Sequence, residues 1–259
     1  MSADFLQKFP LSAVLSLAPG DRSCYFEMER SASMEFSLFG QQFSLFPIML
    51  SLKVAGLSTL ASLILGTLTA RMLARRRSVG AAIIDSLCTL PMVLPPTVLG
   101  YYLILLLGRK GVLGPALQTF GLQFMFSWQG AVVAATVVVF PLIYKSAKTA
   151  LEQVDPNVEK AARTLGASEI SVFFSISLPL AARGILSGSM LAFARGMGEF
   201  GATLMLAGNI PNKTQTLALA IYDAFQSGND ALAACLVILT SGICALILIT
   251  ADYLLGGSR

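Results

Sequence analysis

Two residues of opposite charge, Arg195 and Glu199, lie four positions apart within a long apolar stretch of the sequence. On an α-helix, side chains at this spacing are neighbours and can form an ion pair. A charge near the middle of a bilayer costs about 2.5–3.5 kcal/mol on insertion scales, so such residues normally face protein or water. Two interpretations stay open: an ion pair that fixes helix packing, or a pair lining a path in which Arg195 offers positive potential to an anion.

No other pattern of residue types indicates catalysis. The chain has four cysteines, far apart and without a Cys-x-x-Cys pair, and it has no histidine, so we expect no metal site. The segment Gly208–Thr214 ends in Lys-Thr, as phosphate-binding loops do, but Asn212 stands where such a loop requires glycine, and no strand precedes it. We therefore expect no ATPase site and no cofactor on this chain.

The composition around these residues is that of a membrane protein. Hydrophobic residues make up 55% of the 259 positions and charged residues 12%, whereas a soluble domain has about 25% charged residues. These values exclude an ordinary cytosolic enzyme, a disulfide scaffold and a disordered chain. The basic residues behind the net charge of +4 flank apolar runs instead of forming a stripe, so nucleic acid is not indicated as a partner.

Five apolar stretches approach or exceed the roughly 20 residues that a helix needs to cross a bilayer. We therefore predict an all-α integral membrane protein with about five transmembrane helices and a membrane domain over residues 45–255. Arg195 falls near the centre of the fourth stretch. The predicted spans are 45–70, 81–107, 128–144, 184–207 and 231–255.

Prolines and glycines mark two of these spans. Pro91, Pro95 and Pro96 should kink or break the second span, because proline removes a backbone donor. The result is either a static kink or a hinge or gate. In the fourth span, small residues recur at four-residue spacing, which lets two backbones approach closely, although flexibility is the alternative. Five spans are too few to enclose a pathway, so we expect a two-fold dimer, and a second copy is a candidate packing partner. The small residues are Gly184, Gly188, Ala192 and Gly196.

The Lys and Arg residues set the expected orientation. Loops rich in these residues face the cytoplasm, which places the N-terminus outside and a short tail, 256–259, inside. Residues 1–44 carry few structural signals, and we expect a poorly structured extension; a weak signal-peptide pattern and a start at Met34 are alternatives. Only Arg109, Lys110 and Lys213 fall in the outer loops between spans. The inner set is Arg71, Arg75, Arg76, Arg77, Lys145, Lys148, Lys160, Arg163, Arg183 and Arg259.

The inner loop 145–183 contains a predicted amphipathic helix from Asp155 to Gly166. Asp155 can cap it, proline suits its first position, and Gly166 suits a left-handed end. A second short helix should begin at Ser168 and be closed by Pro179. The apolar face of the first helix comprises Val158, Ala161, Ala162 and Leu165, and the other faces carry Glu159, Lys160 and Arg163.

This helix could be a connector lying on lipid headgroups or a docking element for another protein. Membrane-surface helices usually present large apolar residues to lipid. Two alanines, Ala161 and Ala162, occupy the apolar face here, and small residues permit close approach of a protein surface. The residues alone therefore favour docking.

The same segment resembles a known family. The run E-K-A-A-R-T-L-G over Glu159–Gly166, followed after nine residues by I-S-L-P over Ile176–Pro179, resembles the "EAA" loop of bacterial ABC importer permeases. Lys160 stands where the family has its glutamate, with Glu159 one place earlier. The resemblance implies that this loop couples to an ATPase subunit. Ala161, Ala162 and Gly166 match the family pattern at the right spacing. We expect the coupling role to be carried by these three residues together with Glu159 and Arg163.

Further motifs resemble the molybdate permeases within that family. They are R-G-M-G-E-F-G-A-T over Arg195–Thr203, G-N-I-P over Gly208–Pro211 and P-M-V-L-P-P-T over Pro91–Thr97. Sulfate/thiosulfate permeases share part of this pattern and are the alternative. The likeness covers roughly residues 45–255.

The resemblance implies the type I ABC importer permease arrangement in the bacterial inner membrane. Expected partners are a second copy of the chain, a cytoplasmic ATPase dimer that uses the ATP, and a periplasmic oxyanion-binding protein. A passive channel and a membrane-embedded enzyme are rival classes. A channel predicts flux without ATP, and an enzyme needs titratable residues converging at one depth, where only Arg195 and Glu199 are so placed.

Overall fold

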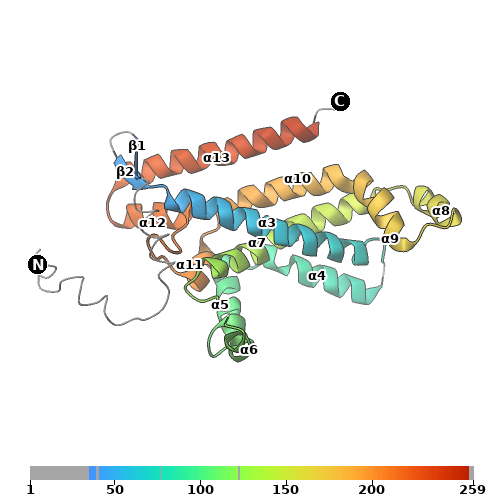
Figure 1. Ribbon diagram of the computed structural model, residues 1–259, viewed down its shortest axis with the longest axis horizontal. Coiled ribbons are helices and arrows are strands. Elements are labelled where there is room, and N and C mark those ends of the chain that lie inside the picture. The colour runs from blue at the N-terminus through green and yellow to red at the C-terminus, as the bar shows by residue number, and fades with distance from the viewer. Residues whose placement is uncertain (1–34, 39–40, 77, 122, 257–259) are drawn as a thin grey trace, which may run out of the picture.

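The computed structural model describes residues 35–38, 41–76, 78–121 and 123–256. Long helices run side by side, with the short helices α8 and α9 at one end (Figure 1). The elements are β1 (Glu35–Leu38), β2 (Gln41–Ser44), α3 (Phe46–Leu73), α4 (Val79–Val93), α5 (Pro96–Leu107), α6 (Gly114–Thr119), α7 (Trp128–Glu152), α8 (Pro156–Thr164), α9 (Glu169–Val172), the π-helical turn η2 (Phe173–Ser177), α10 (Leu178–Met197), α11 (Gly201–Ala207), α12 (Leu217–Gln226) and α13 (Asp230–Gly256).

A short hairpin precedes the helices. Strands β1 and β2 pair antiparallel, with Glu35 opposite Ser44. The end of the segment expected to be poorly structured therefore has regular backbone pairing, and the helical fold carries this one small sheet in its described part. The possible signal peptide and the alternative start at Met34 lie outside the described residues.

The number of spans agrees with the sequence prediction. Four helical segments are long and apolar enough to cross a membrane: Phe46–Leu73, Trp128–Glu152, Glu169–Met197 and Asp230–Thr250. A fifth crossing requires α4 and α5 together, which are bent by 115°. The predicted interruption of this span is confirmed. Pro95 caps α5 and Pro96 is its first residue, where a missing N–H costs no helical hydrogen bond.

The predicted bounds of the fourth span, 184–207, are wrong. The helical crossing begins earlier, at Glu169, and ends at Met197, and α11 is a separate short helix after the break. Gly198 ends α10, and Phe200 leaves helical geometry at φ −122°. Arg195 therefore lies in the last turn of α10 and not near the centre of a span.

Pro179 does not end a helix, contrary to the prediction. It lies in the first turn of α10, which continues directly from α9 and η2. In η2 the N–H of Leu178 donates to the carbonyl of Phe173, five residues back. Because the π turn shifts the hydrogen-bond register, the helix accommodates a proline that would interrupt regular α geometry.

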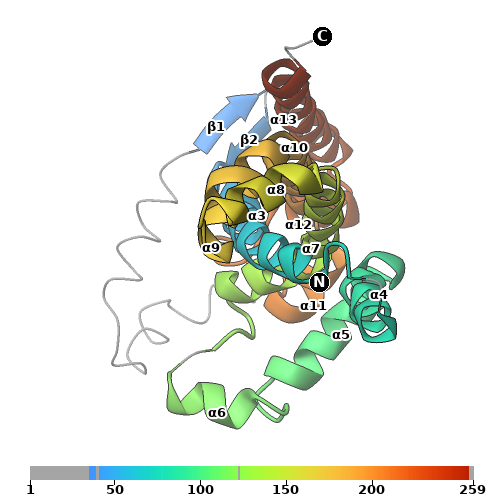
Figure 2. The same ribbon diagram turned by 90° about the vertical axis from the view of Figure 1, so that its right-hand side faces the viewer.

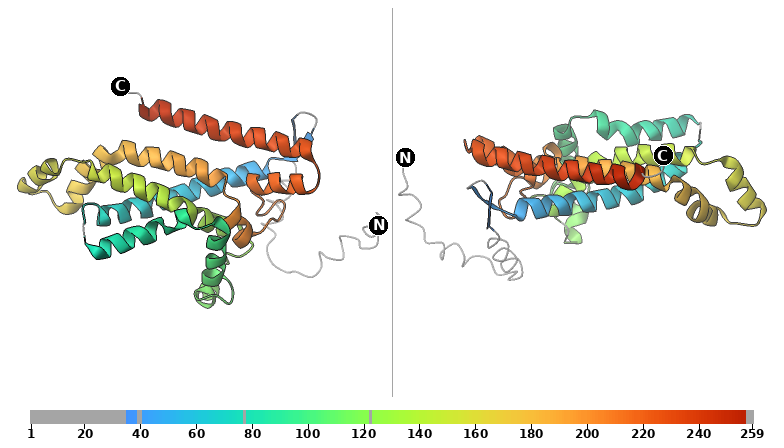
Figure 3. Two further views of the ribbon diagram at one scale, coloured as in Figure 1. Left: turned by 180° about the vertical axis from the view of Figure 1, so that it is seen from behind. Right: turned by 90° about the horizontal axis from the view of Figure 1, so that it is seen from above.

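Helix α7 is the centre of the bundle and packs against α3, α4, α10 and α11. Alanines 131, 134 and 135 are fully buried on it, as is Tyr144 further along. These small side chains let neighbouring helices approach closely. Helix α13 runs along one side of the bundle, α6 projects from it, and α8 lies beyond its end (Figures 2 and 3).

Candidate functional site

Helix α8 is delimited by the residues that the sequence identified. Asp155 caps it by accepting a hydrogen bond from the N–H of Asn157 at 2.8 Å. At the other end Gly166 has φ +89°, and its N–H donates to the carbonyl of Arg163 at 3.0 Å. Such a left-handed residue suits glycine, because a side chain there would be strained.

The apolar face of α8 is exposed. No residue of α8 is fully buried, and Val158 and Leu165 have 43% and 88% of their surface exposed. Ala161 is exposed as well, while Ala162 is half-buried. The predicted face therefore does not pack on the bundle, and it is open to another surface.

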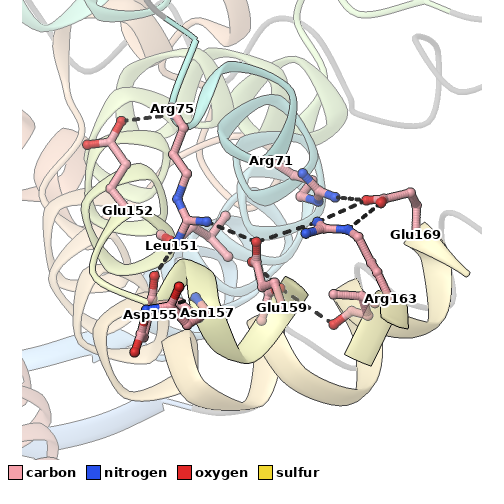
Figure 4. Close-up of polar contacts among 12 residues, drawn as sticks. Arg71, Arg75, Leu151, Glu152, Asp155, Asn157, Glu159, Arg163 and Glu169 are labelled. Atoms are coloured by element: carbon pink, nitrogen blue, oxygen red, sulfur yellow. Dashed lines mark hydrogen bonds and ion pairs between the residues drawn. The ribbon is translucent and has the colours of Figure 1, made fainter. Parts of the chain in front are cut away.

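Glu159 points the other way, into a cluster of polar contacts (Figure 4). Its side chain is only 13% exposed, and one carboxylate oxygen lies 2.9 Å from an Arg75 guanidinium nitrogen. The other oxygen accepts a hydrogen bond from the Ser177 hydroxyl at 2.7 Å, and Arg163 lies 3.6 Å away. Because Arg75 follows α3 and Ser177 ends η2, this one carboxylate joins α8 to α3 and to the start of α10.

Arg75 is held in an unusual backbone conformation by this cluster. Its φ is +64°, which costs an L-residue roughly 1–2 kcal/mol. Besides its ion pair with Glu159, its guanidinium donates to the carbonyls of Leu151, at 3.5 Å, and Val154. The contacts tie the end of α3 to the end of α7.

A second carboxylate extends the network. Glu169, at the start of α9, lies 2.5 Å from Arg163 and 3.2 Å from Arg71. Its hydrogen bond raises the pKa of the Arg163 guanidinium above the ordinary value. The Arg71 guanidinium also lies over the ring of Phe173, 5.5 Å from its centre. Both ends of the α8–α9 segment are thus bound to α3.

The family resemblance implied that Glu159 takes part in the coupling contact, whereas the structure turns its side chain inward. Sequence reasoning also missed four residues of the network: Arg71, Arg75, Glu169 and Ser177. Arg71 and Arg75 were counted only among the basic residues of the inner loops. Ser177 stood inside the I-S-L-P motif without an assigned role. Their meeting depends on how α3, α8 and α10 pack, which no spacing along the chain encodes.

Arg195 and Glu199 do meet, as predicted. Their charged atoms lie 2.8 Å apart, with side chains 40% and 1% exposed, although the Glu199 oxygen facing Arg195 lacks hydrogen-bond geometry. The other oxygen accepts from the N–H of Ala202 at 3.0 Å. Glu199 therefore stabilises the N-terminus of α11, where a negative charge is favoured.

Glycines 184, 188 and 196 of α10 pack against helices of the same chain. A Cβ on Gly188 would lie 2.3 Å from the Cβ of Ser146, and one on Gly184 would lie 2.7 Å from that of Ala150, both on α7. A Cβ on Gly196 would approach Ser58 of α3 at 3.5 Å. Close helix packing, one of the two interpretations, is what the structure contains.

The two interrupted spans meet at their breaks. A Cβ on Gly201, at the start of α11, would lie 3.0 Å from Pro96 at the start of α5. One on Gly100 would lie 2.6 Å from the Cβ of Met205. Helices α5 and α11 therefore pack backbone to backbone, next to the Arg195–Glu199 pair. Pro95 and Pro96 lie at this junction, and Pro91 lies within α4.

Asp85 of α4 holds α4 against α7. It accepts a hydrogen bond from Tyr144 and pairs with Lys145 at 3.0 Å and Lys148 at 2.8 Å. Among the residues that the structure describes, no three His, Cys, Asp or Glu side chains are grouped to hold a metal ion. The described contacts join helices to one another.

Comparison with known proteins gives a consistent result. The model of the family described as "Binding-protein-dependent transport system inner membrane component" matches residues 62–256. The "Molybdenum transport system permease protein ModB" of Escherichia coli (strain K12) is 46% identical over 214 residues, which are 82% of this chain and 93% of that protein. Its namesake in Haemophilus influenzae is 49% identical over 70% of this chain and 79% of that protein.

More distant similarities agree. A "Sulfate transport system permease protein CysW" of Synechococcus elongatus is 33% identical over 76% of this chain and 68% of that protein. A chain of the MetNI methionine ABC transporter, in an inward-facing conformation, has a TM-score of 0.63 at 17% identity, covering 82% of this chain and 94% of that one. A chain of a bacterial alginate ABC transporter has a TM-score of 0.66 at 16% identity, covering 96% and 89%.

Proposed function

The chain belongs to the family of binding-protein-dependent transport system inner membrane components, and from that premise we propose that it is the permease subunit of an ATP-driven molybdate importer. The assignment of molybdate as the substrate rests on the similarity of this chain to molybdenum transport permeases over most of both chains. The sulfate permease is less similar. The fold is that of ABC transporter membrane subunits.

Energy reaches this chain through α8. The exposed face with Val158, Ala161 and Leu165 would dock on a cytoplasmic ATPase, and the ATPase dimer would bind and hydrolyse the ATP. Because Glu159 joins α8 to the ends of α3 and η2, displacement of α8 would move both helices together. Such a switch requires that the ATPase binds two states of the permease with different free energy.

The pathway would lie between two copies of the chain. Five crossings are few for enclosing a path, and a two-fold dimer is the commonest closed arrangement. Arg195, with 40% of its side chain exposed beside a buried Glu199, would offer positive potential to an oxyanion. The junction of the two breaks, with Pro95 and Pro96 against Gly201, would be the element that opens and closes, and Pro91 would let α4 bend with it.

The protein is a multi-pass permease of the inner membrane. We further place α8 and the C-terminus in the cytoplasm and the N-terminus outside, from the distribution of Lys and Arg. A periplasmic oxyanion-binding protein would deliver the substrate to the opposite side. Substrate choice would reside mainly in that protein, because a pathway that bound tightly would release slowly.

Substrate competition tests the assignment. Vesicles containing the permease, its ATPase and its binding protein are given labelled molybdate with a hundredfold excess of unlabelled sulfate. We expect molybdate uptake to continue, whereas unlabelled molybdate or tungstate suppresses it. Uptake of labelled sulfate that molybdate fails to suppress would instead identify a sulfate permease.

A further inference from the structure

A cavity of about 750 Å³ lies at the end of the bundle away from α8. Its walls are the end of α5, the loop that follows, the segment before α7, and the turn after α11. The apolar part of the wall includes Ile104 and Phe126, and the polar part includes Arg109, Lys110 and Lys213. The wall also includes Ser127, which caps α7.

The charge of this cavity has one sign. Arg109, Lys110 and Lys213 bring three positive charges, and the lining contains no Asp or Glu. All three residues are exposed, and none of them has an ion pair with any side chain in the described part of the chain. They are also the three Lys and Arg residues that the sequence places in outer loops, where the positive-inside rule disfavours them. Their gathering around one cavity therefore calls for a ligand of negative charge.

The cavity is separated from α8 by the thickness of a membrane. Helix α7 begins at Trp128, directly after the cavity wall, and ends at Glu152, which accepts a hydrogen bond from the backbone N–H of Arg75 at 3.5 Å. A helix of this length, 25 residues, extends about 37 Å at 1.5 Å per residue.

Two short helices connect the cavity with the Arg195–Glu199 pair. Helix α5 runs from the break at Pro96 to the cavity wall, and α11 runs beside it from the break at Gly201. The wall is bonded to α11, because the N–H of Phe126 donates to the carbonyl of Leu206 at 3.1 Å. An anion in the cavity would thus lie at the outer end of the elements that meet at the breaks.

We propose that this cavity is an electropositive vestibule, which holds a hydrated tetrahedral oxyanion after it leaves the binding protein and before it enters the path. The proposal rests on the proposed function and adds a site to it. The volume exceeds what one tetrahedral oxyanion fills, so the ion would keep part of its water shell and be held by the field of three cations. Clefts lined by charges of one sign raise the local concentration of opposite ions by about 10–1,000-fold. Weak holding suits a transit site, since the ion must leave again.

The test removes the charges together. In vesicles with ATPase and binding protein, the triple variant Arg109→Gln, Lys110→Gln and Lys213→Gln should take up labelled molybdate about tenfold more slowly than the wild type at low salt. The difference should shrink at high salt, because ions screen the field. The charge-retaining triple variant Arg109→Lys, Lys110→Arg and Lys213→Arg should stay close to wild type.

A second measurement separates the vestibule from a protein contact. The affinity of the substrate-free binding protein for each permease variant is measured in the same vesicles. We expect it to be unchanged. A parallel loss of affinity would overturn the proposal and assign the three cations to an acidic surface of the binding protein. Uptake equal to wild type in the Gln variant would overturn it as well, whereas failure of the wild type to transport molybdate would overturn the proposed function itself.

Discussion

The carboxylate of Glu159 holds α8 in place at its end of the molecule. It lies between Arg75 and Ser177, with Arg163 close by, and is almost enclosed. Hydrogen bonds to a charged group contribute about 1.5–3 kcal/mol each, and a buried group left without its partner costs a comparable amount. The attachment of α8 to α3 and α10 should therefore weaken markedly when this charge is removed.

Glu159→Gln tests this attachment in the permease alone. The amide can still accept from Ser177 but no longer pairs with the guanidinium of Arg75. We expect the amide hydrogens of α8 to exchange at least about tenfold faster, the equivalent of about 1.4 kcal/mol. Lys160→Gln, at the exposed neighbouring position, is the matched control and should leave exchange unchanged. Equal exchange rates in the two variants would contradict the attachment of α8 through Glu159.

Gly166 offers a test at the other end of α8. A side chain there meets no atom within 4 Å, so any cost comes from its φ of +89°. Ala in such a conformation costs roughly 1–2 kcal/mol, and Asn tolerates it better. ATP-driven uptake should therefore be highest with the native Gly166, lower in Gly166→Asn and lowest in Gly166→Ala. Uptake unaffected by Gly166→Ala would mean that the end of α8 does not have to be held in this geometry.

At the scale of elements, the helix packing is testable through Gly188. Gly188→Ala places a Cβ 2.3 Å from that of Ser146, so α10 and α7 must move apart. Overpacking of this kind costs about 1–3 kcal/mol, and the thermal unfolding temperature in detergent should drop. Gly242→Ala, where a Cβ meets nothing within 4 Å, should not lower it. Adding Ser146→Gly to Gly188→Ala should restore most of the loss; no drop with Gly188→Ala would contradict the packing.

Elements with strong local signals were predictable from the sequence. The caps of α8 follow from local chemistry: the Asp155 side chain accepts from a backbone N–H two residues on, and Gly166 tolerates a positive φ. The α4–α5 break follows from the missing N–H of Pro95 and Pro96. The break after Met197 was not predicted, because an apolar run continues through it. It depends on Glu199 reaching the N–H of Ala202 and on α11 packing against α5, and neither contact is visible in a hydropathy pattern.

The contacts around Glu159 likewise could not be predicted from the sequence. Arg75 and Glu159 are 84 positions apart, and their pairing exists only because α3 and α7 end at the same level. The sequence identified the exposed apolar face of α8 and could not identify the side chains that attach α8 to the bundle. The Arg195–Glu199 pair was predictable because the two residues are four positions apart. Arg195 lies in the last turn of α10, and Glu199 follows Gly198, at the end of that helix.

At the scale of the whole molecule, the orientation is a direct prediction. In a variant without the four native cysteines, a cysteine introduced by Lys160→Cys should react with a membrane-impermeant thiol reagent only in inverted vesicles. One introduced by Gln118→Cys, in the exposed α6, should react only from the outside of intact cells. The opposite pattern would contradict the assignment that the positive-inside rule gives.

This chain should move anions only when another subunit supplies the energy. The most direct measurement is uptake of labelled molybdate by vesicles that hold the permease with or without its ATPase, with the loaded binding protein outside and ATP inside. We expect molybdate to accumulate when the ATPase and ATP are both present, and not to accumulate when either is omitted. Equal flux in vesicles that contain the permease alone would contradict it.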